Sequence, residues 1–344
     1  MKTYDKSIAI LRVFCILAVI LIHTTTRTLE ATNFSLINFQ WTLFLNQISR
    51  FAVPLFIAIS GFVLELNFNN HINYLSYFKK RISRIVIPYL FWSFAYYFFI
   101  YTNNPSNFLK AFFTGSASYQ LYFIPTLCIY YFIFPFLHKI YKYLSNKWII
   151  ILLFIIQISL LYHDYFVMKF KFDDSIRITL LSFFMFILGM VTSHNKDKTI
   201  QIITRFKIII SSLTAFLGLY IFWEGKSKYL LTNNYLSFYS QWRPSVLLYS
   251  VFVGATFLYV FTKNKFMLSI IEKFSKLSYF VFFAHVIILE LIWFLIGKSI
   301  FEVVSANIYG KIFFDPLFFS LVSIVSFLFA FIIHKISNLY KITG

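Results

Sequence analysis

The chain has 344 residues, of which 60% are hydrophobic, only 12% are charged and 48 are phenylalanine. This composition excludes a soluble globular protein and indicates a polytopic membrane protein. The net charge of +19 does not indicate nucleic-acid binding, because the basic residues lie in short breaks between apolar segments and favour a bilayer surface as partner.

In chain order, the sequence contains about ten apolar segments that are each long enough to cross a bilayer, which takes about 20 residues. They cover residues 8–27, 50–67, 84–101, 119–138, 148–166, 177–193, 208–224, 244–262, 277–296 and 314–334. Most Lys and Arg residues fall in segments expected on the same side of the membrane as the N-terminus. The positive-inside rule therefore predicts that both termini are cytoplasmic. Without a linker or internal repeat, we expect an all-α chain with one domain over 1–344.

Two histidines lie inside apolar segments, where an ionisable side chain is costly unless it has a partner or a function. These are His23 and His285. The remaining histidines, at segment ends or in loops, are interpreted as solvated polar residues: His71, His138, His163, His194 and His334. Cys15 and Cys128 have no pairing pattern, so we expect buried reduced thiols, and no metal site is predicted.

Arg12 and His23 are eleven residues apart in the first segment. Eleven residues make almost three turns of helix and a rise of about 16 Å, so both side chains share one face. A cation near one end and an imidazole deeper in suit acyl-coenzyme A, which carries phosphates at its head and a thioester at its tail. The alternative is an arginine that only reaches lipid phosphate at the helix end.

The arrangement of Arg12 and His23 resembles the signature of the integral-membrane acyltransferase-3 family, whose members transfer acyl groups to extracytoplasmic glycans. Further stretches are similar to the family in the same order, particularly to the branch of the enterobacterial common antigen O-acetyltransferase and exopolysaccharide modification proteins. They are "HTTT" (23–26), "SRFAVPLFIAISGF" (49–62), "YFKKRISRIVIPYLFW" (77–92), "YQLYFIPTLCIYY" (119–131) and "SKLSYFVFFAHVIIL" (275–289). The chain departs from the family pattern at Ala9, where an acidic residue is common, and at Tyr122, where tryptophan is usual.

The resemblance implies roles on the donor side. His23 would act as general base toward a sugar hydroxyl, or alternatively form a covalent acyl-histidine. Arg12, Lys80, Arg81 and Arg84 would bind coenzyme A phosphates at the cytoplasmic mouth, although the loop residues also fit plain positive-inside charge. Ser60 and His285 are further donor-site candidates, and for Ser60 and the adjacent Gly61 helix packing is the favoured interpretation.

On the outer side, Arg50, Trp242 and Arg243 are candidates for binding the acceptor. Arg50 fits a helix-end anchor equally well, and tryptophans such as Trp41 and Trp242 are common at membrane interfaces. Glu290 lies five residues after His285, which points it about 140° away, so it is not expected to be that histidine's direct partner.

The resemblance therefore implies a multi-pass O-acyltransferase of the bacterial cytoplasmic membrane. It would transfer an acyl group, with acetyl favoured, from acetyl-CoA or another acyl-CoA to a cell-envelope saccharide, with no metal. The acyl group, the sugar and the oligomeric state are left open by the sequence. The main alternative is a transporter or flippase of a lipid-linked or polymeric glycan, which the scarcity of acidic residues within the apolar segments makes less favoured.

Overall fold

The computed structural model describes residues 5–31, 37–68, 73–101, 104–232, 238–263, 271–304 and 308–336. Within these ranges the chain is helical and contains no strand, which confirms the predicted all-α class. The same ranges contain nine helical stretches long and apolar enough to cross a membrane, and one shorter apolar helix, Phe123–Lys139. Together they match the expected number of about ten.

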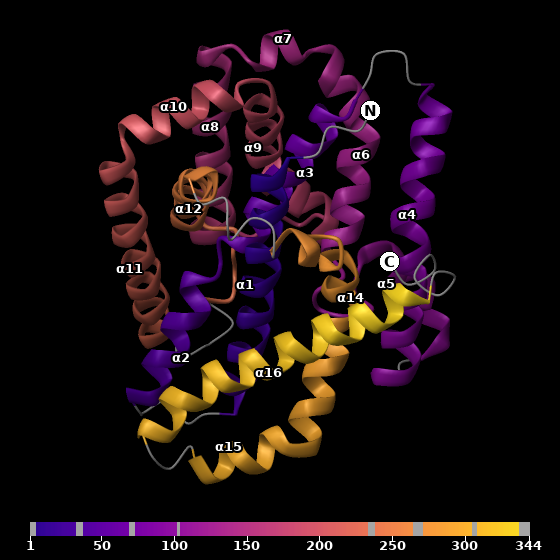
Figure 1. The fold of residues 1–344 in the computed structure, drawn as a ribbon, viewed down its shortest axis with the longest axis vertical. Coiled ribbons are helices and arrows are strands. Elements are labelled where there is room, and N and C mark those ends of the chain that lie inside the picture. Colours follow the sequence, from indigo (N-terminus) through magenta and orange to yellow (C-terminus); the bar gives the residue numbers. More distant parts are fainter. Residues whose placement is uncertain are drawn as a thin grey trace. The chain divides into compact units, whose positions relative to one another are not determined.

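Contacts within the chain divide it into two compact units, one of Met1–Asp5, Phe56–Gln201 and Ile332–Gly344, the other of Lys6–Leu55 and Ile202–Phe331. The first unit holds most of α3 (Ala52–Leu66), α4 (Tyr74–Phe94), η1 (Ala95–Ile100), η2 (Pro105–Asn107), α5 (Phe108–Thr114), α6 (Phe123–Lys139), α7 (Tyr141–Leu144), α8 (Lys147–Tyr162), η3 (His163–Val167), α9 (Asp174–His194) and the start of α10 (Lys196–Arg205). The second holds α1 (Lys6–Glu30), α2 (Ile37–Ile48), α11 (Lys207–Thr232), α12 (Pro244–Lys263), α14 (Ser278–Ile292), η5 (Trp293–Gly297), α15 (Lys298–Val304) and most of α16 (Ile308–Lys335) (Figure 1). The expectation of a single domain stays a prediction.

In the first unit, α3 and α9 cross at two glycines. A Cβ added at Gly61 would lie 2.2 Å from the carbonyl oxygen of Phe186, and one at Gly189 would lie 1.9 Å from that of Ala58. Neither distance leaves room for a side chain, so the two backbones touch directly. This is the packing role that small residues commonly have between membrane helices.

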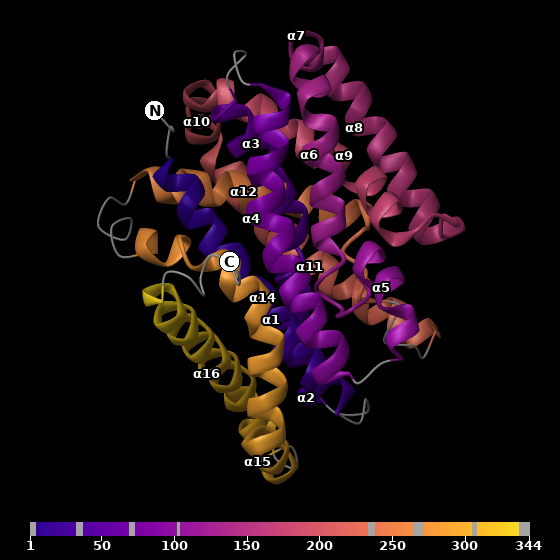
Figure 2. The ribbon, with the colours of Figure 1, turned by 90° about the vertical axis from the view of Figure 1, so that its right-hand side faces the viewer.

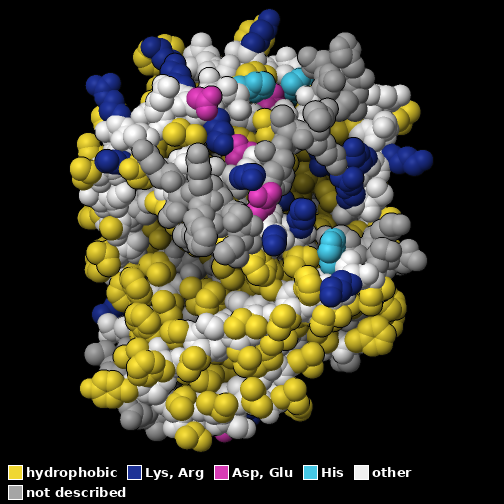
Figure 3. All heavy atoms as spheres, viewed as in Figure 1, with side chains coloured by type: hydrophobic (Ala, Val, Ile, Leu, Met, Phe, Trp, Pro, Cys, Tyr) yellow, Lys and Arg dark blue, Asp and Glu magenta, His cyan; other side chains and the backbone are white. Residues whose placement is uncertain are grey.

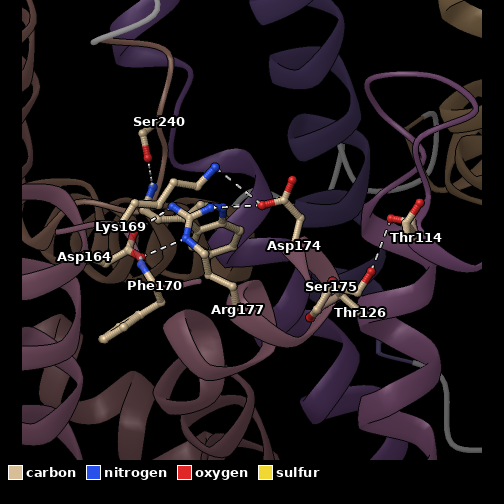
Figure 4. Close-up of polar contacts among 10 residues, drawn as sticks. Thr114, Thr126, Asp164, Lys169, Phe170, Asp174, Ser175, Arg177 and Ser240 are labelled. Atoms are coloured by element: carbon tan, nitrogen blue, oxygen red, sulfur yellow. Dashed lines mark hydrogen bonds and ion pairs between the residues drawn. The ribbon is translucent and has the colours of Figure 1, made fainter. Parts of the chain in front are cut away.

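A buried ion pair joins η3 to α9 in the same unit. Arg177 donates to both carboxylate oxygens of Asp164, from Nε at 2.8 Å and from Nη2 at 2.6 Å (Figure 4). The backbone N–H of Phe170 donates to the same carboxylate at 3.0 Å. The bidentate geometry and the additional donor compensate the Asp164 carboxylate for the loss of water.

In the second unit, α1 is the central helix. It packs against α2, α12 and α14, and Figure 2 shows α14 running beside it. Its buried side chains occur around most of its circumference, as expected of a helix enclosed by others: Ile8, Ile10, Leu11, Cys15, Ile16, Val19, Ile20 and Leu29 among them. Groups on α1 are therefore surrounded by protein over much of its length.

The boundaries of three predicted segments need correction. The segment expected at 50–67 is part of a longer apolar stretch, Phe39–Leu66, formed by α2 and α3. The helix expected to begin at residue 84 begins at Tyr74, because the Asn73 side chain accepts the Leu75 backbone N–H at 2.9 Å and caps it. The segment expected from 119 begins as α6 at Phe123, after a turn that Gly115 enters with φ of 77°.

The C-terminal helix α16 carries a hydrophobic outer face. Figure 3 shows hydrophobic side chains gathered over it, and Phe313, Leu317, Ile324 and Leu328 are each more than half exposed. An apolar cavity of about 320 Å³ lies between this helix and the segment η5–α15, lined by residues such as Ile296, Phe313 and Leu317. Such a surface is suited to hydrocarbon rather than water.

Candidate active site

The imidazole rings of His23 and His285 meet in the second unit. His23 lies in α1 and His285 in α14, and their ring centroids are 5.3 Å apart. His285 is fully buried, whereas His23 is half-buried. The structure thus brings together the two histidines that the sequence singled out for lying inside apolar segments.

The hydrogen bonding of His285 fixes its proton. Its Nδ1 lies 3.0 Å from the carbonyl oxygen of Val281. A carbonyl only accepts, so Nδ1 carries the proton and Nε2 of the neutral ring presents a lone pair. Among the described residues Nε2 has no hydrogen-bond partner, although it is buried. An unpaired buried acceptor is costly, and a catalytic role is one of the recognised reasons for keeping one.

The face of α1 that carries His23 also carries Arg12, which is half-buried. Between them on this face lie Ile16 and Val19, which are 0% and 4% exposed. The two polar side chains therefore share a face, as their spacing predicts, but apolar side chains separate them. An extended ligand that touched both would have to pass alongside Ile16 and Val19 or displace them.

A buried asparagine, Asn46 of α2, holds the turn of α1 that carries His23. Its Nδ2 donates to the carbonyl of Ile22 at 3.1 Å and to the hydroxyls of Thr25 and Thr26 at 3.0 and 3.1 Å. Its Oδ1 accepts from Arg50 Nε at 3.1 Å. Sequence reasoning did not identify Asn46, although an amide four residues before an arginine in a largely apolar stretch is a signal that it could have used.

Two of the expected acceptor-binding residues, Arg50 and Arg243, are internal to the second unit. Arg50 bonds Asn46 and the carbonyl of Tyr239, at 2.5 Å, and is 4% exposed. Arg243 is fully buried and pairs with Glu224 at 3.0 Å. Both arginines thus have protein partners, and their arrangement fixes the loop before α12 against α2.

Trp242, the third expected acceptor-binding residue, lies immediately before Arg243 and is buried at 5% exposure, with its backbone N–H bonded to Ser240. Its burial differs from the exposed position that an interfacial belt would give it.

The remaining donor-site candidates lie in the first unit. Lys80 and Arg81 belong to helix α4 rather than to the loop expected before residue 84, since the helix begins at Tyr74, and Arg84 lies within the same helix. Lys80 and Arg84 are exposed, and the Arg81 guanidinium lies over the rings of Tyr77 and Tyr131 at 5.5 and 5.4 Å. The Ser60 hydroxyl donates to the Phe56 carbonyl of its own helix at 2.9 Å, beside the close crossing at Gly61.

Two histidines that the sequence analysis interpreted as solvated polar residues, His138 and His194, contact a buried carboxylate instead. In the first unit, Oε1 of the buried Glu65 lies 2.9 Å from His138 Nδ1 and 2.8 Å from His194 Nε2. Burial, with the nearby Glu65 charge, raises the pKa of Tyr141, whose ring packs on His194. No group of three metal-ligating side chains in the described ranges is arranged to hold a metal ion, and His71 lies outside those ranges.

Comparison with known proteins decides the family. The model of the acyltransferase-3 family, described as an acyltransferase domain, matches residues 5–335. The chain belongs to the acyltransferase-3 family. It is thus a multi-pass membrane protein of an acyltransferase family, as the resemblance of its motifs implied.

Curated relatives of this acyltransferase-3 chain carry a different description. Proteins of Staphylococcus aureus strains MSSA476 and MRSA252, each named "Probable poly-beta-1,6-N-acetyl-D-glucosamine export protein", are 25% identical to it over 84% of both chains. A protein of Staphylococcus epidermidis with the same name is 25% identical over 84% of this chain and 82% of its own length. No solved structure matches the chain.

Proposed function

We propose that this protein is a membrane O-acyltransferase that moves an acyl group, with acetyl as the first candidate, from acyl-coenzyme A to a hydroxyl of a cell-envelope saccharide. The observation that carries the proposal is the imidazole pair, with centroids 5.3 Å apart in the interior of an acyltransferase-family chain. Histidine is the side chain that enzymes use most often to take a proton from a reacting hydroxyl.

In the proposed reaction, His23 removes the proton from the sugar hydroxyl as its oxygen attacks the thioester carbonyl. The new C–O bond forms, the C–S bond breaks, and coenzyme A leaves as a thiol after taking the proton from the imidazolium. The Nε2 lone pair of His285 can share the proton while it resides on the histidine pair. A covalent acyl-histidine is the variant of this mechanism in which His23 itself attacks the thioester.

Arg12 is proposed to meet the phosphates of the donor, with α1 crossing the bilayer so that Lys6 and Arg12 lie toward the cytoplasm. This orientation agrees with the positive-inside rule. It would place His23 about 16 Å deeper along the helix, so that a flexible pantetheine arm could connect the two. In this arrangement the donor stays in the cytoplasm of the bacterium and only the acyl group crosses.

The alternative is an exporter of a polymeric glycan, which the printed names of the staphylococcal relatives favour. The two functions differ in what they leave behind. An acyltransferase increases the mass of its glycan by one acyl unit for each event, whereas an exporter leaves the mass unchanged.

The test reconstitutes the purified full chain in proteoliposomes with acetyl-CoA, labelled with carbon-13 in the acetyl group, and a β-1,6-linked N-acetylglucosamine oligosaccharide. The expected result is an O-linked labelled acetyl group on the oligosaccharide, detected by mass spectrometry, that is lost with His23→Ala. Passage of unmodified oligosaccharide across the bilayer without labelling would instead favour the exporter.

A further inference from the structure

Beyond the imidazole pair, α1 and α14 come together again through three charged side chains, Arg27, Glu30 and Glu290, here termed the Glu–Arg–Glu cluster. Arg27 Nη2 lies 3.4 Å from Glu290 Oε2, and Nη1 lies 3.7 Å from Glu30 Oε2. Both distances are longer than the 2.7–3.2 Å of an ordinary hydrogen bond. The arginine is therefore ion-paired, but its N–H groups make no hydrogen bond to the described part of the chain, and its Nε is buried without a partner.

The guanidinium of Arg27 is nevertheless fixed in place. It lies over the ring of Trp293 at 5.3 Å, and Trp293 itself is buried at 5% exposure. The tryptophan thus supports one face of the guanidinium through a cation–π contact. The side chains of Arg27, Glu30 and Glu290 are 36%, 40% and 31% exposed, so the cluster is reachable from outside the protein.

The cluster is close to the proposed reaction centre. Arg27 follows His23 by four residues in the same helix, which is one turn and a rise of about 6 Å. Glu290 follows His285 by five residues in α14. The same two helices therefore present the histidines and, one to two turns farther along, the three charged side chains.

The composition of the cluster selects a class of ligand. Two carboxylates and one guanidinium have a net charge of −1, which disfavours phosphates and uronic acids. The carboxylates accept hydrogen bonds from hydroxyl groups, and the guanidinium donates to hydroxyl, ring or amide carbonyl oxygens. A ligand rich in both donors and acceptors but without negative charge matches this set, and a saccharide is such a ligand.

We propose that Arg27, Glu30 and Glu290 form the binding subsite for the saccharide acceptor, which they hold with a hydroxyl directed at His23. This inference rests on the proposed function for its placement of the reaction, although saccharide binding itself can be measured separately. It gives Arg27 an acceptor-binding role in place of Arg50 and Arg243, whose guanidiniums bond buried protein groups.

The test uses the full chain in lipid nanodiscs with two probes of equal length, a β-1,6-linked N-acetylglucosamine pentasaccharide and a pentagalacturonate. Glu290→Gln and Glu30→Gln change charge with almost no change in shape, and Glu302→Gln on α15 is the matched control. Glu302 is an exposed glutamate paired with Lys298 at 4.0 Å. We expect the wild type to bind the neutral oligosaccharide and to reject the uronate in saturation-transfer NMR.

For Glu290→Gln, the KM for the neutral oligosaccharide should rise about tenfold, as the loss of a charge-assisted hydrogen bond predicts, with no change in the KM for acetyl-CoA. Discrimination against the uronate should decrease in the same variant, and Glu302→Gln should match the wild type. An unchanged oligosaccharide KM in a folded Glu290→Gln would overturn the proposal while the transferase function stands.

If the wild type binds the oligosaccharide through these residues but transfers no acetyl group, the proposed function fails and the subsite remains. If the wild type binds no oligosaccharide at all, the subsite proposal is wrong. A cluster that only joins α1 to α14 would lower the melting temperature in the glutamine variants without changing either KM.

Discussion

The ring of His285 lies 5.3 Å from the ring of His23, centroid to centroid, although the two residues belong to the first and one of the last helices of the chain. Their meeting depends on the packing of α14 against α1. Because one ring is fully buried with a free Nε2 and the other is half-buried, the pair combines a shielded base with a reachable one.

Replacing His23 with alanine should reduce the rate of acyl transfer at least about 100-fold, the usual contribution of a positioned general base. The variant should insert and fold normally, since a smaller side chain at a half-buried position leaves the surrounding helices intact. Transfer of labelled acetyl to oligosaccharide measures the rate, and His334→Ala, an exposed histidine of α16, is the control. Wild-type rates in the His23 variant would remove it from the mechanism.

His285 allows a test that separates its two nitrogens. Asparagine can keep a donor near the position of Nδ1, facing the Val281 carbonyl, but lacks Nε2; glutamine extends its amide toward the position of Nε2. We expect His285→Asn to lower kcat about tenfold or more with little change in the acceptor KM, and His285→Gln to retain more activity. Equal activity in both variants and the wild type would limit His285 to packing.

Arg12→Ala should raise the KM for acyl-coenzyme A about tenfold, because one charge-assisted phosphate contact is lost. Lysine at the same position should recover part of the affinity, as a point charge without the planar fork of arginine. Isothermal titration with a non-hydrolysable acetyl-CoA analogue measures the change directly. Lys147→Ala, at an exposed lysine of α8, provides the comparison, and an Arg12→Ala variant that behaves like it would exclude Arg12 from the donor site.

Replacing Asn46 with leucine should affect both stability and rate. The buried Arg50 guanidinium would lose one of its acceptors and keep the Tyr239 carbonyl, a cost of about 2 kcal/mol. The turn from Ile22 to Thr26 would lose three hydrogen bonds. We expect a lower melting temperature in detergent and a lower kcat with an unchanged donor KM. A variant with the lower melting temperature but wild-type kcat would show that Asn46 stabilises the helices without positioning His23.

Alanine should have opposite effects on stability at two glycines, one at the crossing of α3 and α9 and one in α11. Gly189→Ala should destabilise the first unit by about 1–3 kcal/mol or more, because the added Cβ would meet the Ala58 carbonyl oxygen. Gly218→Ala in α11 should be neutral or stabilising, since its nearest neighbour would be Tyr249 at 3.4 Å and alanine is the better helix former. Thermal unfolding followed by tryptophan fluorescence distinguishes the two, and a similar melting temperature for both variants would contradict this account.

The membrane class and the all-α fold could be predicted because each rests on local composition, and the same composition singled out His23 and His285, whose rings the fold brings together. A run of 18 or more apolar residues is a helix in a bilayer regardless of its neighbours, and an imidazole inside such a run stands out by its cost. Helix starts were less predictable, because the cap at Asn73 is a single side-chain contact. With that cap the basic residues 79–81, which were expected in a loop, lie in α4.

The partners of polar residues could not be predicted, because they depend on which helices meet. Arg50 and Arg243 read as surface cations in the sequence, but Asn46, Glu224 and the Tyr239 carbonyl occupy their donors. Arg27 was not considered, since it lies at a helix end, where a cation is ordinary. Its position one turn after His23 was visible in the sequence, whereas its pairing with Glu290 required the fold.

Ile16 and Val19 lie buried on the stretch of α1 between Arg12 and His23, which bears on the membrane barrier as well as on the proposed reaction. A permanently open passage along this stretch would leak protons and ions down the membrane potential. In the proposed donor arrangement, these two branched aliphatic side chains would act instead as a hydrophobic seal, which the narrow thioester arm of the donor would displace as it enters. The proposed access for the donor would then be compatible with energy conservation by the membrane.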